Sequence, residues 1–529
     1  FLTFELPFHA INYCLEEGNI HINEVDHFAY SFDPYQLLPQ QFADKDSIPI
    51  PLHSRPGDQD SMWSNEWDPL FLSSIVNARL QLQDGYPHHL QKRFVGANIP
   101  ESKWHFVDHH IAHAASAFHA SPFREAAVIT IDGRGEKATT TYSVGRDNQL
   151  ERIAQVNMPH SLGLLYERVT TYLGFLHSSD EYKVMALASY GKPVFTDIFR
   201  SMIRIGDDGT YTIENDNLEK HFGPTRLRNE PFTEHHFNIA HSLQLVLEES
   251  ILKLVDWFQQ QTEMENLCLA GGVALNCVAN ARIRDKSRFK QVWVQPAAGD
   301  AGTALGGALW IDSRQRGGRD RNFRMDHVYW GPQYSDEQIQ KFLNWTKIRY
   351  RKLNDIAVET ADFLAADKII GWFQGRMEFG PRALGSRSIL ASPINPSMQA
   401  RLNEVKDRED FRPVAPVVLE EDAAEWFKDA GYSPFMLFVN EVNPDKAALI
   451  PAVRHVDGTA RIQTVNKAQH PLYHQLLVEF KKRTGVPVLV NTSFNTLGKP
   501  IVCTPRDAIE CFYGSPFDAL VIGSFLLEK

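Results

Sequence analysis

Short apolar runs that end in glycine turns recur through the first 300 residues. They cover residues 128–135, 267–272 and 292–302. A short apolar run followed by glycine predicts a buried strand that turns into a helix. Residues 139–144 alternate like a strand that follows a hairpin, and residues 240–262 carry the period of an amphipathic helix. The pattern predicts an α/β nucleotide-binding fold with a cleft between two lobes.

The first hundred residues show a different pattern. Residues 1–45 predict a helix, a turn and then a strand near residues 27–30. Residues 46–65 are rich in Pro, Ser and Asp, which predicts a loop, and residues 66–95 predict helix.

A domain boundary is predicted between residues 313 and 335. Residues 313–321 are polar, charged and rich in glycine, as linkers often are, and a new helix is expected after residues 330–332. We therefore expect one domain over residues 1–325 and a second α/β domain over residues 326–529.

Length and composition exclude several classes of protein. The 529 residues are too many for one core, and 43% hydrophobic with 22% charged residues is ordinary for a globular protein. The net charge of −11 argues against nonspecific binding of nucleic acid or anionic membrane. Five cysteines without a CxxC pair fit a reducing cytosol, and neither a membrane span nor a secretory signal is visible. We expect a cytoplasmic protein; a homo-oligomer stays open.

Two histidines and two aspartates predict a metal site. His109 and His113 are four residues apart, which places both imidazoles on one face of a helix. Asp132 closes an apolar run before a glycine turn, and Asp300 occupies a similar place after residues 292–294. A carboxylate beside backbone N–H groups suits a metal next to phosphates. The alternative is chance, because this region holds five histidines.

A glycine pair predicts a second contact with a nucleotide. Gly271 and Gly272 follow an apolar strand and open a helix, whose N-terminus favours phosphate. Asn276 follows as a candidate for binding a ribose or phosphate. The alternative for the glycine pair alone is a tight turn without a ligand. Lys183 either pairs with a phosphate or is a solvated surface lysine, and both interpretations stay open.

Cations gather in the second half of the chain. Residues 375–388 carry three arginines among glycines and hydroxyls, residues 406–412 add more cations, and residues 488–495 form a strand that runs into a polar turn. Arginine, lysine and hydroxyl groups together suit a small phosphorylated substrate. Taken alone, residues 401–412 are more typical of a solvated helix face.

At these residues the sequence resembles the NodU/CmcH-type O-carbamoyltransferases over nearly its whole length. The resemblance rests on motifs in a fixed order: HHIAHAASA, IDGRGE, SLGLLYE, DEYKVMALASYG, LAGGVALN, PAAGDAGTALGGA, GRMEFGPRALGSRSIL, VKDREDFRPVAP and VNTSFN. It implies an actin-like ATPase domain (ASKHA class, Kae1-like) followed by a YrdC-like α/β domain.

The resemblance also implies ligands and the residues that hold them. It implies Fe(II) at the two histidines and two aspartates, although such ligands also suit Zn or Mn. It implies ATP, with Mg, as co-substrate in a cleft. The residues expected to bind ATP, besides Lys183, are Gly133, Gly135, Gly163, Gly271, Gly272 and Asn276. It implies carbamoyl phosphate in the second domain, held by Arg382, Lys406, Arg412, Arg461, Asn491 and Ser493. Arg382, Lys406 and Arg412 are the candidate catalytic residues of this site.

The implied reaction has two stages. Carbamoyl phosphate is cleaved and the carbamoyl group is adenylated with release of pyrophosphate, after which carbamoyladenylate passes to a substrate hydroxyl. The acceptor hydroxyl needs a base. In the family this base is expected in a His-Asp-Ala-Ser-like turn after the first strand, and this chain starts downstream of it. Phe1 is not Met and the chain opens inside a predicted helix, so we expect a missing N-terminal segment.

Other functions share these domain types. A tRNA threonylcarbamoyladenosine synthase would favour a basic surface, which the net charge opposes. A hydrogenase-maturation carbamoyltransferase would show CxxC pairs. A nucleotide-binding regulator of actin-like fold without transfer chemistry would need only one phosphate site, and the cations in the second half of the chain speak against it. The acceptor is not identified, and its pocket is expected in the loops at residues 46–65 and 205–235.

Overall fold

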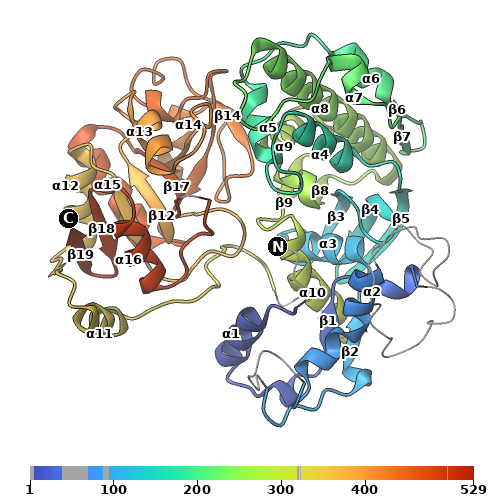
Figure 1. Cartoon of the computed structure of the whole chain (residues 1–529), viewed down its shortest axis with the longest axis horizontal. Helices are drawn as coiled ribbons and strands as arrows, with labels where there is room; N and C mark the ends of the chain where they lie inside the picture. Colours follow the sequence, from blue (N-terminus) through green and yellow to red (C-terminus); the bar gives the residue numbers. More distant parts are fainter. Residues whose placement is uncertain (1–4, 39–68, 87–93, 318–320, 322, 497) are drawn as a thin grey trace.

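The computed structural model describes residues 5–38, 69–86, 94–317, 321, 323–496 and 498–529. Two large sheets dominate it, and they lie in the two halves of the chain (Figure 1). The loop predicted at residues 46–65 lies outside the described residues. Among the helices of the described part, none is long and apolar enough to cross a membrane.

The first large sheet has the strand order β5-β4-β3-β8-β9. Its strands are β3 (Glu125–Ile131), β4 (Ala138–Arg146), β5 (Gln149–Asn157), β8 (Asn266–Ala270) and β9 (Gln291–Val294). β3, β8 and β9 run parallel, whereas β4 and β5 form an antiparallel meander with β3. After its first residue β3 is buried throughout, because helices cover both faces, and this explains its continuous apolar run.

The two faces of this sheet bury alternate residues of β3. One face packs Ala127, Ile129 and Ile131 against helices that follow in the chain. These are α4 (Leu162–Tyr172), α5 (Glu181–Ala188), α8 (Glu234–Thr262) and α9 (Cys277–Lys286). The other face packs Ala126 and Val128 against α3 (His109–Phe118). The predicted strands and glycine turns are therefore confirmed.

Two sequence expectations in this half need correction. α8 begins at Glu234 rather than at residue 240, because the Thr233 N–H donates to Nδ1 of His236 and starts the helix before its apolar period begins. The helix predicted over residues 66–95 is shorter. α2 (Pro69–Val76) passes into a 3-10 segment that ends at Leu82, and Gly85 turns the chain with a φ of 81°.

A small lobe stands before the first sheet. It contains α1 (Phe8–Gly18) and a parallel strand pair, β1 (Phe28–Tyr30) and β2 (Trp104–Phe106). The predicted helix and the strand near residue 28 are confirmed.

The second large sheet has the strand order β10-β19-β18-β11-β12-β17-β13-β16. Its strands are β10 (Arg351–Lys352), β11 (Ile370–Phe373), β12 (Arg387–Ala391), β13 (Ala415–Leu419), β16 (Gln463–Val465), β17 (Val488–Ser493), β18 (Ala519–Ile522) and β19 (Phe525–Glu528). The accompanying helices are α11 (Asp336–Thr346), α12 (Ile356–Ala365), α13 (Met398–Val405), α15 (Pro471–Thr484) and α16 (Pro505–Tyr513). One hydrophobic core runs from Ile339 to Leu527, so the mixed α/β class is confirmed in both halves. The division at residue 325 stays a prediction.

α10 (Thr303–Gln315) packs directly on α3. At Gly306 the two backbones approach so closely that a β-carbon would lie 1.8 Å from the carbonyl oxygen of Ala112. Only glycine fits there. The contact brings the N-terminal turn of α10 beside the first two turns of α3.

We predict that Gly306→Ala forces α3 and α10 apart and lowers the free energy of unfolding by at least about 1–3 kcal/mol, as overpacking does. Gly307→Ala is the matched control, because its β-carbon would meet only the Ala29 side chain, at 3.3 Å. Urea unfolding of both variants measures the difference. Equal effects of the two substitutions would contradict the contact.

Candidate functional site

The first candidate site begins at the N-terminus of α3. Asp108 caps this helix, since its Oδ1 accepts the Ile111 N–H at 2.9 Å, and Arg152 forms an ion pair with the same carboxylate. The cap fixes where the helix starts and therefore which face carries His109 and His113. Both imidazoles are buried.

Two aspartates reach the same point from separate turns. Asp132 follows β3, and its Oδ1 accepts the Gly272 N–H at 2.9 Å. Its other oxygen, Oδ2, lies 3.1 Å from Nε2 of His109 and 3.3 Å from Nε2 of His113. Asp300 stands between β9 and α10, and its Oδ1 lies 3.5 and 3.6 Å from the same two nitrogens. Its side chain is 77% exposed, so the cluster opens to solvent on this side.

The separations between the two Nε2 atoms and Oδ2 of Asp132 fit three ligands of one ion, with Oδ1 of Asp300 slightly farther away. Two ligands about 2.1 Å from one ion lie about 3.0–3.4 Å apart when the angle between them is near 90–110°. The two imidazole Nε2 atoms are 3.1 Å apart, and all four ligand atoms lie within 4.8 Å of one another. Among the described residues this is the one group of three or more such ligands. We call these four residues the metal cluster.

The charges of the cluster reinforce one another. Burial alone would lower the pKa of His109, but hydrogen bonds to Asp132 and Asp300 raise it well above its ordinary value. Burial alone would raise the pKa of Asp132, whereas hydrogen bonds from His109 and His113 hold it well below its usual range. The imidazole nitrogens and carboxylate oxygens that share protons here can also bind a metal cation, which would displace those protons.

The predicted nucleotide glycines line the turns beside the metal cluster. Gly271 has a φ of 90°, and a β-carbon there would lie 2.2 Å from the Ile131 carbonyl oxygen. A β-carbon on Gly163 would lie 2.7 Å from the Asp132 carbonyl oxygen, and one on Gly135 would meet the His110 ring. These glycines allow the turn after β3 to pack closely against the turn after β8 and against the N-terminal ends of α3 and α4. Contact with a nucleotide stays a prediction.

Asn276 and Lys183 already have partners. Asn276 caps α9 by accepting the Ala279 N–H at 3.0 Å, and it exchanges two hydrogen bonds with Gln244. Nζ of Lys183 lies 2.9 Å from Glu409 and 3.2 Å from Asp180, and its side chain is 16% exposed. The interpretation of Lys183 as a solvated surface lysine is therefore wrong.

The second candidate site is a cluster of cations in the second half of the chain. Repulsion between positive charges links Arg382 with Arg461, Arg408 with Arg412 and Arg461, and Lys406 with Arg408 and Arg412. We call these five residues the cation cluster.

The glycine-rich loop at residues 375–388 carries Arg382, a member of the cation cluster. Oε1 of Glu378 accepts three backbone N–H groups of this loop. The Arg387 guanidinium donates to backbone carbonyls at both ends of the loop and to the carbonyl of Pro332.

Lys406 is buried, and the four arginines of the cation cluster are half-buried. Burial and the neighbouring Arg461 lower the pKa of Arg382 to about 9, and burial with Arg412 lowers that of Arg408 to about 9. Burial and the nearby arginines hold the pKa of Lys406 well below its usual value. The expectation of a solvated helix face over residues 401–412 is therefore wrong at these positions.

The predicted substrate residues differ in how fully they are already bonded. Lys406 donates to Oγ of Ser493 at 3.1 Å and to Oδ1 of Asn495 at 2.7 Å. Asn491 donates to the Ala383 carbonyl, but its buried Oδ1 has no partner among the described residues. The buried Nε atoms of Arg382 and Arg461 likewise lack a partner there. These unpaired buried atoms are available to a ligand or to water.

The two halves of the chain meet at the cation cluster. The guanidinium carbon of Arg412 lies 4.8 Å from the centre of the Tyr182 ring, and the Tyr190 hydroxyl donates to the Phe411 carbonyl at 3.3 Å. Both tyrosines belong to the α5 region. Sequence reasoning missed Arg408 and Glu409, although they stand inside the cationic run at residues 406–412.

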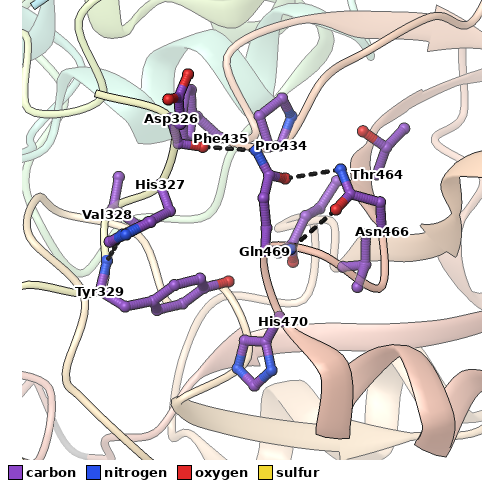
Figure 2. A pocket seen from close by; sticks show the side chains of 12 residues that line it. Asp326, His327, Val328, Tyr329, Pro434, Phe435, Thr464, Asn466, Gln469 and His470 are labelled. Carbon is purple, nitrogen blue, oxygen red and sulfur yellow. Dashed lines mark hydrogen bonds between the residues drawn. The ribbon is translucent and has the colours of Figure 1, made fainter. Parts of the chain in front are cut away.

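A small polar pocket marks another junction between the halves, but no predicted site residue lines it. Figure 2 shows Gln469 reaching toward the linker, where its amide donates to the Asp326 carbonyl at 2.5 Å. Burial lowers the pKa of His470 in the same wall to about 4. Through the hydrogen bond between Gln469 and Asp326, the wall of this pocket connects the linker to the second half of the chain.

Comparison with known proteins identifies the family. The family model described as Carbamoyltransferase N-terminus matches residues 6–309, and the one described as Carbamoyltransferase C-terminus matches residues 361–529. The chain belongs to the carbamoyltransferase family. The family expected from the motifs is confirmed, and this carbamoyltransferase is an enzyme.

Relatives match the carbamoyltransferase over most of its length. It is 38% identical over 543 residues to nodulation protein NolNO of Sinorhizobium fredii, covering 99% of this chain and 75% of the relative. An uncharacterised protein of Synechocystis, sll1178, is 40% identical over 574 residues, covering 99% and 90%. Solved structures of P. abyssi Sua5 with L-threonine and of full-length HypF each match with a TM-score of 0.23 and 16% identity. They cover 32% and 34% of this chain and 46% and 22% of theirs, and so slight a likeness carries no argument.

We predict that His113→Ala weakens binding of a divalent metal by more than the roughly 10- to 100-fold that loss of an outer partner costs. The matched control is His110→Gln, because His110 is buried on the same helix and pairs instead with Thr130 at 2.6 Å. Metal titration of the folded apoprotein gives both affinities. Equal affinities would rule out this cluster as the metal site.

Proposed function

We propose that the protein is an ATP-dependent O-carbamoyltransferase. It moves the carbamoyl group of carbamoyl phosphate, through carbamoyladenylate, to a hydroxyl of a small natural product. We also propose that the first domain is actin-like (Kae1-like) and the second YrdC-like. The first sheet supports this assignment, because the meander β5-β4-β3 continues into the parallel strands β8 and β9, and Asp132 follows β3 while the Gly271 turn follows β8.

The observation that carries the proposal is the cation cluster, in which Lys406 is buried and the arginines are half-buried. Four guanidinium groups and an ammonium group lie together, and Glu409, the carboxylate that pairs with Arg412, is shared with Lys183. Burying like charges is unfavourable unless an anion joins them. The unpaired Nε atoms of Arg382 and Arg461 are donors for such an anion. Their forked geometry suits phosphate oxygens.

The carbamoyl end of the donor needs a different contact. Its amino group is a hydrogen-bond donor, and the buried Oδ1 of Asn491 is an acceptor without a partner among the described residues. Asn491 and Arg382 belong to one neighbourhood, because Asn491 donates to the carbonyl of Ala383. A ligand with N–H groups at one end and a phosphate at the other therefore matches the polarity of this site.

Bond changes follow from this arrangement. Water cleaves carbamoyl phosphate to carbamate and orthophosphate, and arginine and lysine charges stabilise the negative charge that develops on the phosphate. The carbamate oxygen then attacks the α-phosphorus of ATP, and pyrophosphate leaves. In the second stage the acceptor oxygen attacks the carbonyl carbon, and AMP leaves.

The metal cluster fits the second stage. The two histidines and two aspartates offer nitrogen and oxygen ligands that suit Fe(II), with Zn and Mn as alternatives. A bound divalent ion would supply charge that binds phosphate oxygens and polarises the carbonyl. The N-terminus of α9 after Gly272 offers a favourable end for the phosphates of a nucleotide.

The donor half of the reaction gives a direct test. We predict that intact protein, incubated anaerobically with Fe(II), ATP and carbamoyl phosphate but no acceptor, releases pyrophosphate only when carbamoyl phosphate is present. Arg412→Ala should lower this rate by about 100-fold or more, because it removes a charge from the phosphate site. Measured products are pyrophosphate, orthophosphate and carbamoyladenylate.

Arg506→Ala is the control, since Arg506 is exposed and pairs with Glu510 on its own helix. It should leave the rate unchanged. Absence of pyrophosphate from folded, metal-loaded protein would exclude adenylation and would favour a nucleotide-binding regulator instead.

A further inference from the structure

A buried carboxylate outside the metal cluster holds the start of α3. Glu136 is 3% exposed, and its two oxygens lie 3.0 and 3.2 Å from the backbone nitrogen of His109. It stands four residues after Asp132, on the other side of the same glycine turn. One short turn therefore supplies a ligand of the cluster and also binds the backbone of a second ligand.

The same carboxylate binds a segment of the small lobe. Oε1 of Glu136 accepts the Asp33 N–H at 2.6 Å. Two residues earlier, the carbonyl oxygen of Ser31 lies 3.2 Å from Nδ1 of His109. A carbonyl can only accept, so Nδ1 carries the proton of the neutral ring. Nε2, which faces the two aspartates, is then the atom with a free electron pair.

The segment at residues 31–33 also reaches the turn that carries Asp300. Oγ of Ser31 lies 2.7 Å from Oγ1 of Thr303, and the Thr303 hydroxyl donates to the Asp300 carbonyl at 2.7 Å. Glu136 and Ser31 together thus connect the backbones that present three of the four ligands.

We propose that Glu136 is a positioning residue of the metal cluster, which sets the ring orientation and tautomer of His109 through its backbone N–H and through the segment at residues 31–33. The inference rests on the proposed metal site. Outer partners of this kind orient a ligating histidine and raise its basicity. A carboxylate is needed because both oxygens accept hydrogen bonds beside the positive end of a helix.

Two variants of Glu136 distinguish the effect of its charge from the effect of its side-chain length. Glu136→Gln keeps one accepting oxygen and loses the charge, whereas Glu136→Asp keeps the charge on a shorter side chain. Asp355→Asn is the matched control, because Asp355 caps α12 in the other half by accepting the Val358 N–H at 3.0 Å. It removes the charge of a helix cap in the other half of the chain and leaves an accepting oxygen in place.

The experiment titrates Co²⁺ into the metal-free full chain and follows both affinity and the d–d absorption bands. We expect Glu136→Gln to weaken binding by roughly 10- to 100-fold with altered bands, Glu136→Asp to recover part of both, and Asp355→Asn to change neither. Thermal unfolding without metal shows that each variant is folded.

Three results decide the matter. If wild type and Glu136→Gln bind Co²⁺ with equal affinity and equal bands, the positioning role is overturned while the metal site stands. A lower melting temperature with unchanged affinity has the same meaning, because it assigns Glu136 a purely structural role. If wild type itself binds no Co²⁺, the proposed metal site fails and the positioning role falls with it.

Discussion

The backbone contact between α3 and α10 is the constraint on which the first site depends. The two histidines stand on one helix and Asp300 stands at the start of the other. Their ligand atoms come within 4.8 Å of one another only because Gly306 lets the helix backbones touch. The turns after β3 and β8 then stack through further glycines, so the site is a product of close packing rather than of any single loop. Its rigidity comes from the same source, since backbone packed on backbone has little room to move.

The second site obeys the opposite constraint, because its members repel one another. The loop that carries Arg382 is held in place by bonds that involve no cation of the cluster. Glu378 and Arg387 fix the loop of Arg382 entirely through backbone groups. The loop is consequently organised before an anion arrives, and its charges need not be gathered at the moment of binding. Such preorganisation lowers the free energy that ligand binding must supply.

Local patterns in the sequence revealed the parts of the site that local structure creates. Helical spacing predicted that His109 and His113 share a face, and an apolar run ending in Asp132 predicted a strand and its turn. Long-range partners left no such trace. Glu136 acts on α3 across 27 residues, and Glu409 reaches Lys183 across the interface between the halves. The run at residues 401–412 has the composition of a solvated helix, yet tertiary packing buries Lys406. Burial of that kind is decided by the whole fold.

Glu409 joins the two halves in a thermodynamic sense. One oxygen lies 2.9 Å from Lys183, and the other lies 3.3 Å from Arg412. A single negative charge is divided between a cation of each half. When an anion binds Arg412, Glu409 interacts less with Arg412 and more strongly with Lys183. By linkage, an anion that binds Lys183 strengthens the interaction of Glu409 with Arg412 to the same extent. The energies of the two ion pairs are therefore not additive, and the electrostatic state of either half is partly a property of the other.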